Sequence, residues 1–404
     1  MSDWEEVRLK DICTNIQYGY TESASNEVIG PKFLRITDIV NSSIHWSTVP
    51  YCKITDSDFK KYQLFKGDIV VARTGNTTGW AKLIRNNINS VFASYLIRFQ
   101  LNKDVAYSGY VGRLIESDIF KGYVRSIIGG SAQPGANAVF LSDFKLILPP
   151  LPTQQKIAKI LSNYDDLIEN NLKRIKLLEE SARLTYEEWF LRFRIDGKKL
   201  DIDSESGLPF GWKNVLLSDY IDLLRGHEPG SSAYEEEKTS SNIPFIRVGD
   251  LSKRESDIYI SKDLSKNKII EESDILLSLD GSPGMVKFGL SGCYSTGIRR
   301  ALSKQKNISN IFILNLLNSQ YIQSLINAYA TGATILHAGS SVKKMRFVLP
   351  TNEILDKYND IEMKKFRSIL NLQGQIKFLK EARDILLPRL MTGMIDTDKL
   401  KVAV

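Results

Sequence analysis

Short polar loops that contain glycine carry the residues of this sequence that could recognise a ligand. They occupy positions 18–21, 73–79 and 129–137 in the first half, and 225–228, 280–284 and 331–337 in the second. Their amide, hydroxyl and guanidinium groups can hydrogen-bond the edges of nucleic-acid bases, and glycine lets the backbone approach a phosphate. One such loop is a weak signal, because Gly, Asn and Ser segments are usually turns. Loops at matched positions with different side chains are what a protein would require to recognise two different halves of one target.

The motifs of the common catalytic classes are missing from the sequence. It contains no G-x-x-x-x-G-K-[ST] loop, no G-x-G-x-x-G, no His-Glu-x-x-His and no Asn/Asp-Pro-Pro-aromatic run. The histidines His45, His227 and His337 lack the spacing of metal ligands. The carboxylates Asp165 and Asp166 fall in the first turns of an expected helix, where the helix dipole favours negative charge. We therefore expect no catalysis by this chain and a structural role for this pair.

The composition is that of a globular protein with a weakly positive charge. Of its 404 residues, 43% are hydrophobic and 25% are charged, and the formal net charge of +7 fits a polyanionic partner without requiring one. No apolar run approaches the ~20 residues of a membrane span. The acidic start lacks the pattern of a signal peptide, and three scattered cysteines fit a reducing compartment. We expect a cytoplasmic protein. If it binds nucleic acid, we expect other subunits to contribute part of the binding surface.

The elements that must position the loops are present twice. Four residue types recur in step near the start of each half: Trp4, Val7, Leu9 and Asp11, then Trp212, Val215, Leu217 and Asp219. Segments 33–39, 68–75 and 146–149 have counterparts at 245–251, 274–281 and 347–350. A period of roughly 200 residues is far longer than the 20–50 residues of a solenoid repeat. The repeated unit is therefore a whole globular domain followed by a helix.

Each half has the pattern of an α+β domain. In the first half, short apolar runs at 33–39, 68–73, 91–100 and 144–148 predict strands separated by turn residues. Helical runs are expected at 107–123 and, in the second half, at 308–330. We expect four segments along the chain, with globular domains at 1–150 and 200–350 and helical spacers at 151–199 and 351–404.

Each globular segment leads into a helix with a narrow apolar seam. The seam residues of the first helix step by four and three positions: Ile157, Leu161, Tyr164, Ile168, Asn171, Ile175, Leu178 and Ala182. The last helix repeats the seam less regularly, at Ile369, Leu372, Ile376, Leu379, Arg383, Leu386 and Leu390. Such narrow seams favour two helices packed on each other over helices that each lie on their own domain. Asn171 would then make a polar pair that fixes the register.

The order of these segments resembles that of the DNA-specificity subunit of type I restriction–modification systems. The matching pieces are the paired openings at 4–11 and 212–219, the runs Phe33-Leu34-Arg35 and Phe245-Ile246-Arg247, and the segments 67–75, 130–133 and 147–158. The resemblance covers essentially the whole chain, although Ile335 stands near the place of Gln133 in the second half. It implies an α+β fold with two pseudo-symmetric target-recognition domains, joined by two long antiparallel helices that form a coiled coil.

The resemblance also implies a function and partners. Each globular domain would read one half of a bipartite target in double-stranded DNA, and the helices would set the spacing. Methyltransferase subunits, expected in two copies, would dock on this scaffold and methylate adenine, and restriction–translocation subunits would join them. S-adenosylmethionine, ATP and magnesium are then expected only on the partner subunits. The alternatives are a coiled-coil scaffold without DNA binding, a stand-alone nuclease or methyltransferase, and a solitary DNA-binding subunit of another defence system.

The site residues expected on this basis are polar loop side chains and charged helix residues. The expected DNA contacts are Tyr20, Arg73, Asn76, Thr77, Lys82, Ser131 and Gln133 in the first half, and Arg225, His227, Ser282, Lys287 and His337 in the second. The expected docking surface for methyltransferase subunits includes Lys156, Arg174, Lys364 and Arg367 on the outward faces of the helices.

Overall fold

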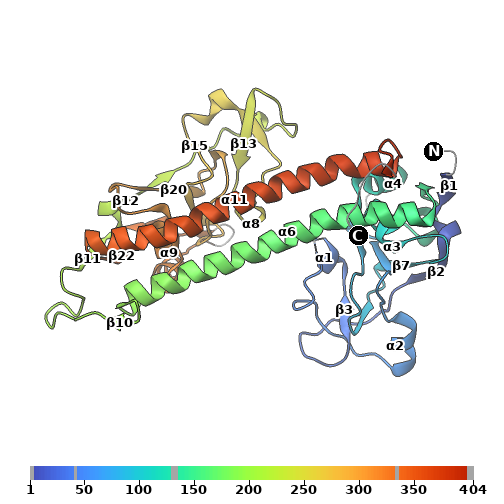
Figure 1. Cartoon of the computed structure of the whole chain (residues 1–404), viewed down its shortest axis with the longest axis horizontal. Coiled ribbons are helices and arrows are strands. Elements are labelled where there is room, and N and C mark those ends of the chain that lie inside the picture. Colours follow the sequence, from blue (N-terminus) through green and yellow to red (C-terminus); the bar gives the residue numbers. More distant parts are fainter. Residues whose placement is uncertain (1–3, 41–42, 129–134, 333–335, 398–404) are drawn as a thin grey trace. The chain divides into compact units, whose positions relative to one another are not determined.

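Two compact units make up the chain (Figure 1). The structure, a computed structural model, describes residues 4–40, 43–128, 135–332 and 336–397. One unit is Met1–Leu167 with Leu379–Val404, and the other is Ile168–Phe378. The long helices α6 (Leu151–Tyr186) and α11 (Asn352–Met391) each contribute to both units. The four segments expected from the sequence stay a prediction, because the compact units divide both helices.

An antiparallel four-stranded sheet organises the globular part of the first unit. Its strands lie in the order β2 (Cys13–Tyr18), β7 (Leu96–Leu101), β4 (Ile69–Ala72) and β5 (Ala81–Leu83). Two smaller pairs accompany it, β1 (Glu5–Arg8) with β8 (Lys145–Leu148) and β3 (Lys32–Leu34) with β6 (Ser90–Phe92). The helices are α1 (Ile36–Ile39), α2 (Asp56–Tyr62), α3 (Ser108–Glu116), α4 (Asp118–Ile128) and α5 (Ala138–Ser142).

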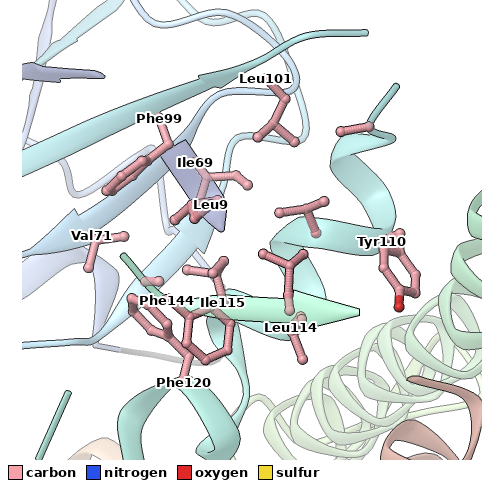
Figure 2. Close-up of a cluster of buried hydrophobic side chains, with 14 of the residues drawn as sticks. Leu9, Ile69, Val71, Phe99, Leu101, Tyr110, Leu114, Ile115, Phe120 and Phe144 are labelled. Carbon is pink, nitrogen blue, oxygen red and sulfur yellow. The ribbon is translucent and has the colours of Figure 1, made fainter. Parts of the chain in front are cut away.

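The core of the first unit forms between this sheet and the helices α3 and α4 (Figure 2). Ile69 and Phe99 from the sheet are buried in one cluster with Leu114 and Phe120 from the helices. The Phe120 ring meets the Phe144 ring edge-on, with the ring centres 5.1 Å apart. The cluster also includes side chains from both long helices, namely Ile157, Leu161, Leu390 and Met391. The start of α6 and the end of α11 are therefore held by the same hydrophobic core.

The second unit repeats this architecture. Its matching sheet has the order β12 (Ile221–Arg225), β20 (Ile298–Ser303), β16 (Ile275–Ser278) and β18 (Val286–Lys287). A separate pair, β11 (Lys213–Leu216) with β22 (Arg346–Leu349), corresponds to the pair of β1 with β8. Another sheet has the order β14 (Tyr259–Ser261), β13 (Asn242–Ile246), β19 (Gly292–Tyr294) and β15 (Ile269–Ile270). Short pairs are β9 (Arg194–Ile195) with β10 (Lys198–Lys199), and β17 (Asp280–Gly281) with β21 (Leu336–His337). The helices are α7 (Leu217–Tyr220), α8 (Asp250–Lys253), α9 (Asn310–Asn318) and α10 (Gln320–Ala328). The duplicated α+β fold is confirmed.

An ion pair between an arginine and a buried aspartate recurs at the same place in the two sheets. Arg98 of β7 lies 3.6 Å from Asp68, and Arg300 of β20 lies 2.9 Å from Asp274. Each aspartate directly precedes a central strand of its sheet, and its carboxylate accepts a hydrogen bond from the backbone amide three residues earlier. The duplication therefore extends from the apolar pattern to the polar groups that are buried with it.

Two sequence predictions of single helices are wrong in detail. The helices expected at 107–123 and 308–330 are each split in two, because Ser117 and Ser319 have an extended backbone between the pairs α3–α4 and α9–α10. Serine side chains compete with the helix for backbone hydrogen bonds. The Ser117 hydroxyl donates to the Leu114 carbonyl at 2.6 Å and so helps to end α3.

The strand expected at 33–39 also differs, because it ends early with β3. The Asp38 carboxylate accepts a hydrogen bond from the Arg35 amide at 2.9 Å, which starts the short helix α1. The Asp250 carboxylate accepts from the Arg247 amide at the same distance before α8. The shared Arg-x-x-Asp pattern of the two halves is thus a helix-starting turn instead of strand.

The two long helices pack on each other along the predicted seam. In the second unit, Asn171 Nδ2 of α6 donates to Gln375 Oε1 of α11 at 3.2 Å, and the Lys365 ammonium of α11 donates to the Ser181 hydroxyl of α6 at 3.0 Å. Residue numbers rise along α6 as they fall along α11, so the helices are antiparallel. The buried seam residues are Ile157, Leu161, Ile168, Asn171, Ile175, Ala182, Ile369, Leu372, Ile376 and Leu390. The coiled coil and the polar pair of Asn171 are confirmed, and the alternative in which each helix lies only on its own domain is wrong.

Asp165 of α6 joins the helix pair to the globular part of the first unit. Its carboxylate lies 2.7 Å from Arg113 of α3, 2.9 Å from Arg383 of α11 and 3.8 Å from Arg85. Burial acts to raise the pKa of the Asp165 carboxyl, but Arg113 and Arg383 outweigh it and hold the pKa below its ordinary value. Asp165 therefore has a structural role, but the expected reason is wrong: α6 begins at Leu151, so the pair Asp165 and Asp166 lies well inside the helix and not in its first turns.

Candidate nucleic-acid interface

The loops of interest gather at one edge of the four-stranded sheet in each unit. In the first unit this loop edge lies where β2 and β4 end and β7 begins, and in the second where β12 and β16 end and β20 begins. The backbone makes the same hydrogen bond at both places. The Gly19 amide donates to the Leu96 carbonyl at 3.1 Å, and the Gly226 amide donates to the Ile298 carbonyl at 3.3 Å. The two loop edges therefore share one backbone frame.

Glycine is required at the first residue after β2 and after β12. A Cβ atom on Gly19 would lie 2.2 Å from the carbonyl oxygen of Ala93, and one on Gly226 would lie 2.2 Å from that of Tyr294. Because both obstacles are backbone atoms, no side-chain movement could relieve the overlap. The same residue type thus fixes the frame in both units, while the side chains around it differ.

Arg73 lies at the first loop edge and is held from two sides. Its Nε donates to the Ser94 carbonyl at 3.1 Å, and its guanidinium lies 5.1 Å from the ring centre of Tyr18. The Tyr18 hydroxyl accepts a hydrogen bond from the Ala138 amide at 3.0 Å. Tyr18 was not among the expected contacts, and its place beside Arg73 arises because β2 and β4 end at the same edge. The available sequence signal was the place of Tyr18 in the glycine-containing loop 18–21.

The other expected contacts of the first half have varied surroundings. Asn76 is exposed and Thr77 is half-buried in the turn Gly75–Thr77 that follows Arg73. Tyr20 is half-buried, and its ring centre lies 5.3 Å from that of a neighbouring tyrosine, so part of its surface is engaged in packing. Ser131 and Gln133 lie outside the described residues.

Four expected residues of the second half come together at its loop edge. Arg225 is exposed, and its Nε donates to the Thr296 carbonyl at 3.3 Å. His227 is half-buried two residues after the end of β12, and Ser282 is exposed directly after β17. His337 is exposed on β21, which pairs with β17. The structure therefore gathers these side chains, although their contacts with DNA stay a prediction.

Two charged residues at the second loop edge were missed by the sequence analysis. The Asp280 carboxylate lies 2.8 Å from His337 Nδ1 and 3.6 Å from the Arg299 guanidinium. Arg299 Nη1 donates to the Thr296 carbonyl at 2.5 Å, and Arg299 lies directly opposite Arg225 on the neighbouring strand. Burial lowers the pKa of the Arg299 guanidinium, and the Asp280 carboxylate opposes that shift. Since the register of β12 with β20 creates this cluster, no local sequence pattern could have identified it.

Lys82 and Lys287 have other neighbours than the loop residues. They lie on the outer strands β5 and β18, both are half-buried, and burial lowers the pKa of each ammonium group. The acidic groups that act on Lys82 are Glu116 of α3 and Asp165 of α6, and for Lys287 the acidic group is Glu179 of α6. The structure does not gather these lysines with the loop side chains, and a DNA contact by either stays a prediction.

The residues expected to dock partner subunits lie on α6 and α11, where Arg174, Lys364 and Arg367 are exposed and Lys156 is half-buried. Their role stays a prediction. The sequence analysis missed large apolar side chains that are exposed on the same helices: Leu172, Leu177 and Phe378 in the second unit, and Ile385 in the first. Single exposed apolar side chains are common on protein surfaces, so these residues add candidates for a docking surface without establishing one. They could have been found in the sequence as apolar residues outside the seam.

Comparison with known proteins finds similarity along nearly the whole chain. A family model described as the type I restriction modification DNA specificity domain matches residues 1–180 and 209–372. The type I restriction enzyme MjaIX specificity subunit of Methanocaldococcus jannaschii is 27% identical over 420 aligned positions, which cover 98% of this chain and 95% of that protein. The HindI specificity subunit of Haemophilus influenzae is 23% identical, with 98% of this chain and 100% of that protein covered. The crystal structure of a type I restriction-modification system S subunit from M. genitalium has a similar fold, with a TM-score of 0.56, 15% identity and 96% of each chain covered.

Proposed function

The chain belongs to the type I restriction modification DNA specificity family, and from this membership we propose that it selects the DNA target of a type I restriction–modification complex. Each globular domain reads one half of a bipartite sequence in double-stranded DNA. The paired helices set the unread spacer between the two halves. The curated relatives, which are named as specificity subunits, support this proposal.

The observation that carries the proposal is the pair of loop edges. Their backbone frames match at Gly19 and Gly226, whereas the polar groups differ: Arg73 stands beside Tyr18 in the first, and Arg225 beside Arg299 in the second. Sequence-specific proteins distinguish bases through the side chains they present to the groove, and backbone contacts mainly fix position. One frame with two sets of side chains suits a target whose two halves differ.

The helices support the part of the proposal that concerns spacing and assembly. With 36 residues, α6 is about 54 Å long at a rise of 1.5 Å per residue, which exceeds one turn of duplex DNA. Basic residues such as Arg174 and Arg367 and apolar residues such as Leu177 and Phe378 are exposed along the pair. We propose that methyltransferase subunits dock there. Because the helical segments are duplicated, we propose two copies.

We further propose that the chemistry belongs to the partner subunits. S-adenosylmethionine, ATP and magnesium would then bind to the methyltransferase and restriction–translocation subunits, with this chain as a non-catalytic member of the complex. Within the ranges that the structure describes, no cluster of three or more His, Cys, Asp or Glu side chains is arranged to hold a metal ion. Nor does any helix in that part of the chain combine the length and the apolar character of a membrane span. We propose that the complex acts on DNA in the cytoplasm.

The test is to map methylated adenines in cellular DNA with and without this gene, in the presence of the methyltransferase subunit. We expect methylation at a bipartite motif with a fixed spacer only when the intact gene is present. An otherwise identical strain with an early stop codon in the gene is the matched control. Methylation that persists unchanged without the gene would contradict the proposal. A complex that assembles on this chain but retains no particular duplex would instead favour a scaffold without DNA binding.

A further inference from the structure

One backbone carbonyl at each loop edge holds an arginine side chain. The Ser94 carbonyl accepts from Arg73 Nε at 3.1 Å, and the Thr296 carbonyl accepts from Arg225 Nε at 3.3 Å. In both units the carbonyl belongs to the turn that precedes the strand at the centre of the loop edge, β7 or β20. A guanidinium anchored through Nε has a fixed plane, because rotation about the end of the side chain would break this hydrogen bond.

The two carbonyls are structurally equivalent. The turn before β7 is closed by a hydrogen bond from the Leu96 amide to the Ala93 carbonyl at 2.9 Å, and the turn before β20 by the matching bond from Ile298 to Ser295 at 3.0 Å. In each turn, the carbonyl that holds the arginine belongs to the residue directly after the acceptor of this bond. The two arginines are therefore anchored at one common point of the repeated frame.

The arginines reach that point from different strands. Arg73 follows β4, whereas Arg225 ends β12, which is the counterpart of β2. The residue that matches Arg225 in the first unit is Tyr18, at the end of β2, and the residue that matches Arg73 in the second unit is Leu279, directly after β16. A guanidinium is thus present at the same carbonyl although the arginines do not align in the repeated sequence. The guanidinium group therefore has the same position in both units, but the strand that carries the arginine differs.

Both guanidinium groups leave two N–H-bearing atoms available. In the part of the chain that the structure describes, the Nη1 and Nη2 atoms of Arg73 and Arg225 have no hydrogen-bond partner. In the first unit the Tyr18 ring supports the guanidinium from one side at 5.1 Å. Two donors in a fixed plane match two acceptors that lie side by side. In the major groove, guanine offers such a pair in O6 and N7.

At the second loop edge, two arginines lie side by side and only one of them has an ion-pair partner among the described residues. Arg225 and Arg299 face each other on neighbouring strands, and both donate to the Thr296 carbonyl. Like charges in directly opposed positions destabilise a sheet. Asp280 pairs with Arg299, and among the described residues no carboxylate forms an ion pair with Arg225. An acceptor-rich edge of a ligand would relieve this repulsion.

We propose that Arg73 and Arg225 each read one guanine, from a single shared position in the repeated frame. Each half-site then contains a guanine at the matching place relative to its domain. The inference rests on the proposed function, because it assumes that the loop edges face DNA. It adds the class of base that is read and the residue that reads it.

The test moves the arginine of the first unit from the residue after β4 to the end of β2. This is the position that carries the arginine in the second unit. Arg73→Leu is made alone and together with Tyr18→Arg, in the full-length chain assembled with its methyltransferase subunits. Binding is measured to duplexes in which each guanine of both half-sites is replaced in turn. Arg73→Leu should lower discrimination at one guanine of one half-site by on the order of 10- to 100-fold and leave the other half-site unchanged. The double variant should restore discrimination at that guanine. Arg225→Tyr, alone and with Leu279→Arg, is the matched pair for the other half-site.

Three results would overturn the inference. The first is an Arg73→Leu variant with unchanged preference at every position. The second is a uniform loss of affinity for all sequences with a weaker salt dependence, which marks a phosphate contact. The third is a double variant that melts like the wild type and still discriminates no better than Arg73→Leu. If a double variant does not fold, the single variants Arg73→Leu and Arg225→Tyr decide the question, because each should lose discrimination at one guanine of its own half-site only. A wild-type complex without any sequence preference would instead refute the proposed function.

Discussion

Replacing residues 205–350 with the corresponding segment of a relative that has another target should change one half of the methylated sequence and leave the other half intact. The segment begins before β11 and ends after β22, so it contains the whole second loop edge and spares α6 and α11. The first loop edge is built only from residues of the first unit. Sequencing of methylated DNA from cells with the chimaeric chain gives the readout.

The mirror exchange of residues 1–150 is the control for that experiment. It should change the half that the first exchange preserves. A chimaera in which both halves of the target change, or in which the whole original target is kept, would contradict the assignment of one half-site to each domain.

Phe190→Ala should lower the free energy of unfolding of the second unit by about 3–5 kcal/mol. Phe190 is 2% exposed, and its ring centre lies 4.9 Å from that of Tyr358 of α11 and 5.2 Å from that of Phe312 of α9. Phe190 lies in the π-helical turn Glu187–Leu191 that follows α6, and its truncation leaves a cavity where this turn, the start of α11 and the globular domain meet within this unit. Urea unfolding of the full chain, followed by tryptophan fluorescence, measures the loss.

The neighbouring Leu191→Ala variant is the matched control for Phe190→Ala. Leu191 is 50% exposed, and surface substitutions of this kind change stability by less than about 0.5 kcal/mol. An equal effect of the two substitutions would refute the packing role assigned to Phe190.

The duplicated fold and the coiled coil could be predicted because their signals are strong and local. The openings at Trp4 and Trp212 recur with the same spacing of apolar residues, and these become the equivalent strands β1 and β11. The seam from Ile157 to Ala182 follows the helical period closely enough to indicate a partner helix. Even the polar Asn171 could be understood, since a single polar residue on such a seam commonly pairs across it.

Local conformation was harder to predict than architecture. Apolar periodicity continues through Ser117 and Ser319, so the broken helices looked continuous in the sequence. The apolar run that begins at Phe33 likewise suggested a longer strand. Its end is decided by one hydrogen bond, from the Arg35 amide to the Asp38 carboxylate. Such short-range polar contacts outweigh the hydrophobic pattern over a few residues.

The candidate interface could be predicted only in part. Glycine-containing loops at matched places led to Arg73, Arg225 and His337, which the structure places at the loop edges. The cluster of Asp280 with Arg299 depends on strand register, which the sequence does not state. The surroundings of Lys82 and Lys287 could not be predicted, because the acidic groups near them come from helices distant in the sequence.

The central claim is that the paired helices fix the separation between the two globular domains that recognise DNA. Its most direct test inserts seven residues between Leu167 and Ile168 of α6 and seven between Phe378 and Leu379 of α11. Each insertion preserves the seam and adds about 10 Å of helix, which corresponds to roughly three base pairs. Sequencing of methylated DNA should then find both original half-sites with an unread spacer that is longer by about three base pairs. The same half-sites with an unchanged spacer would contradict the claim.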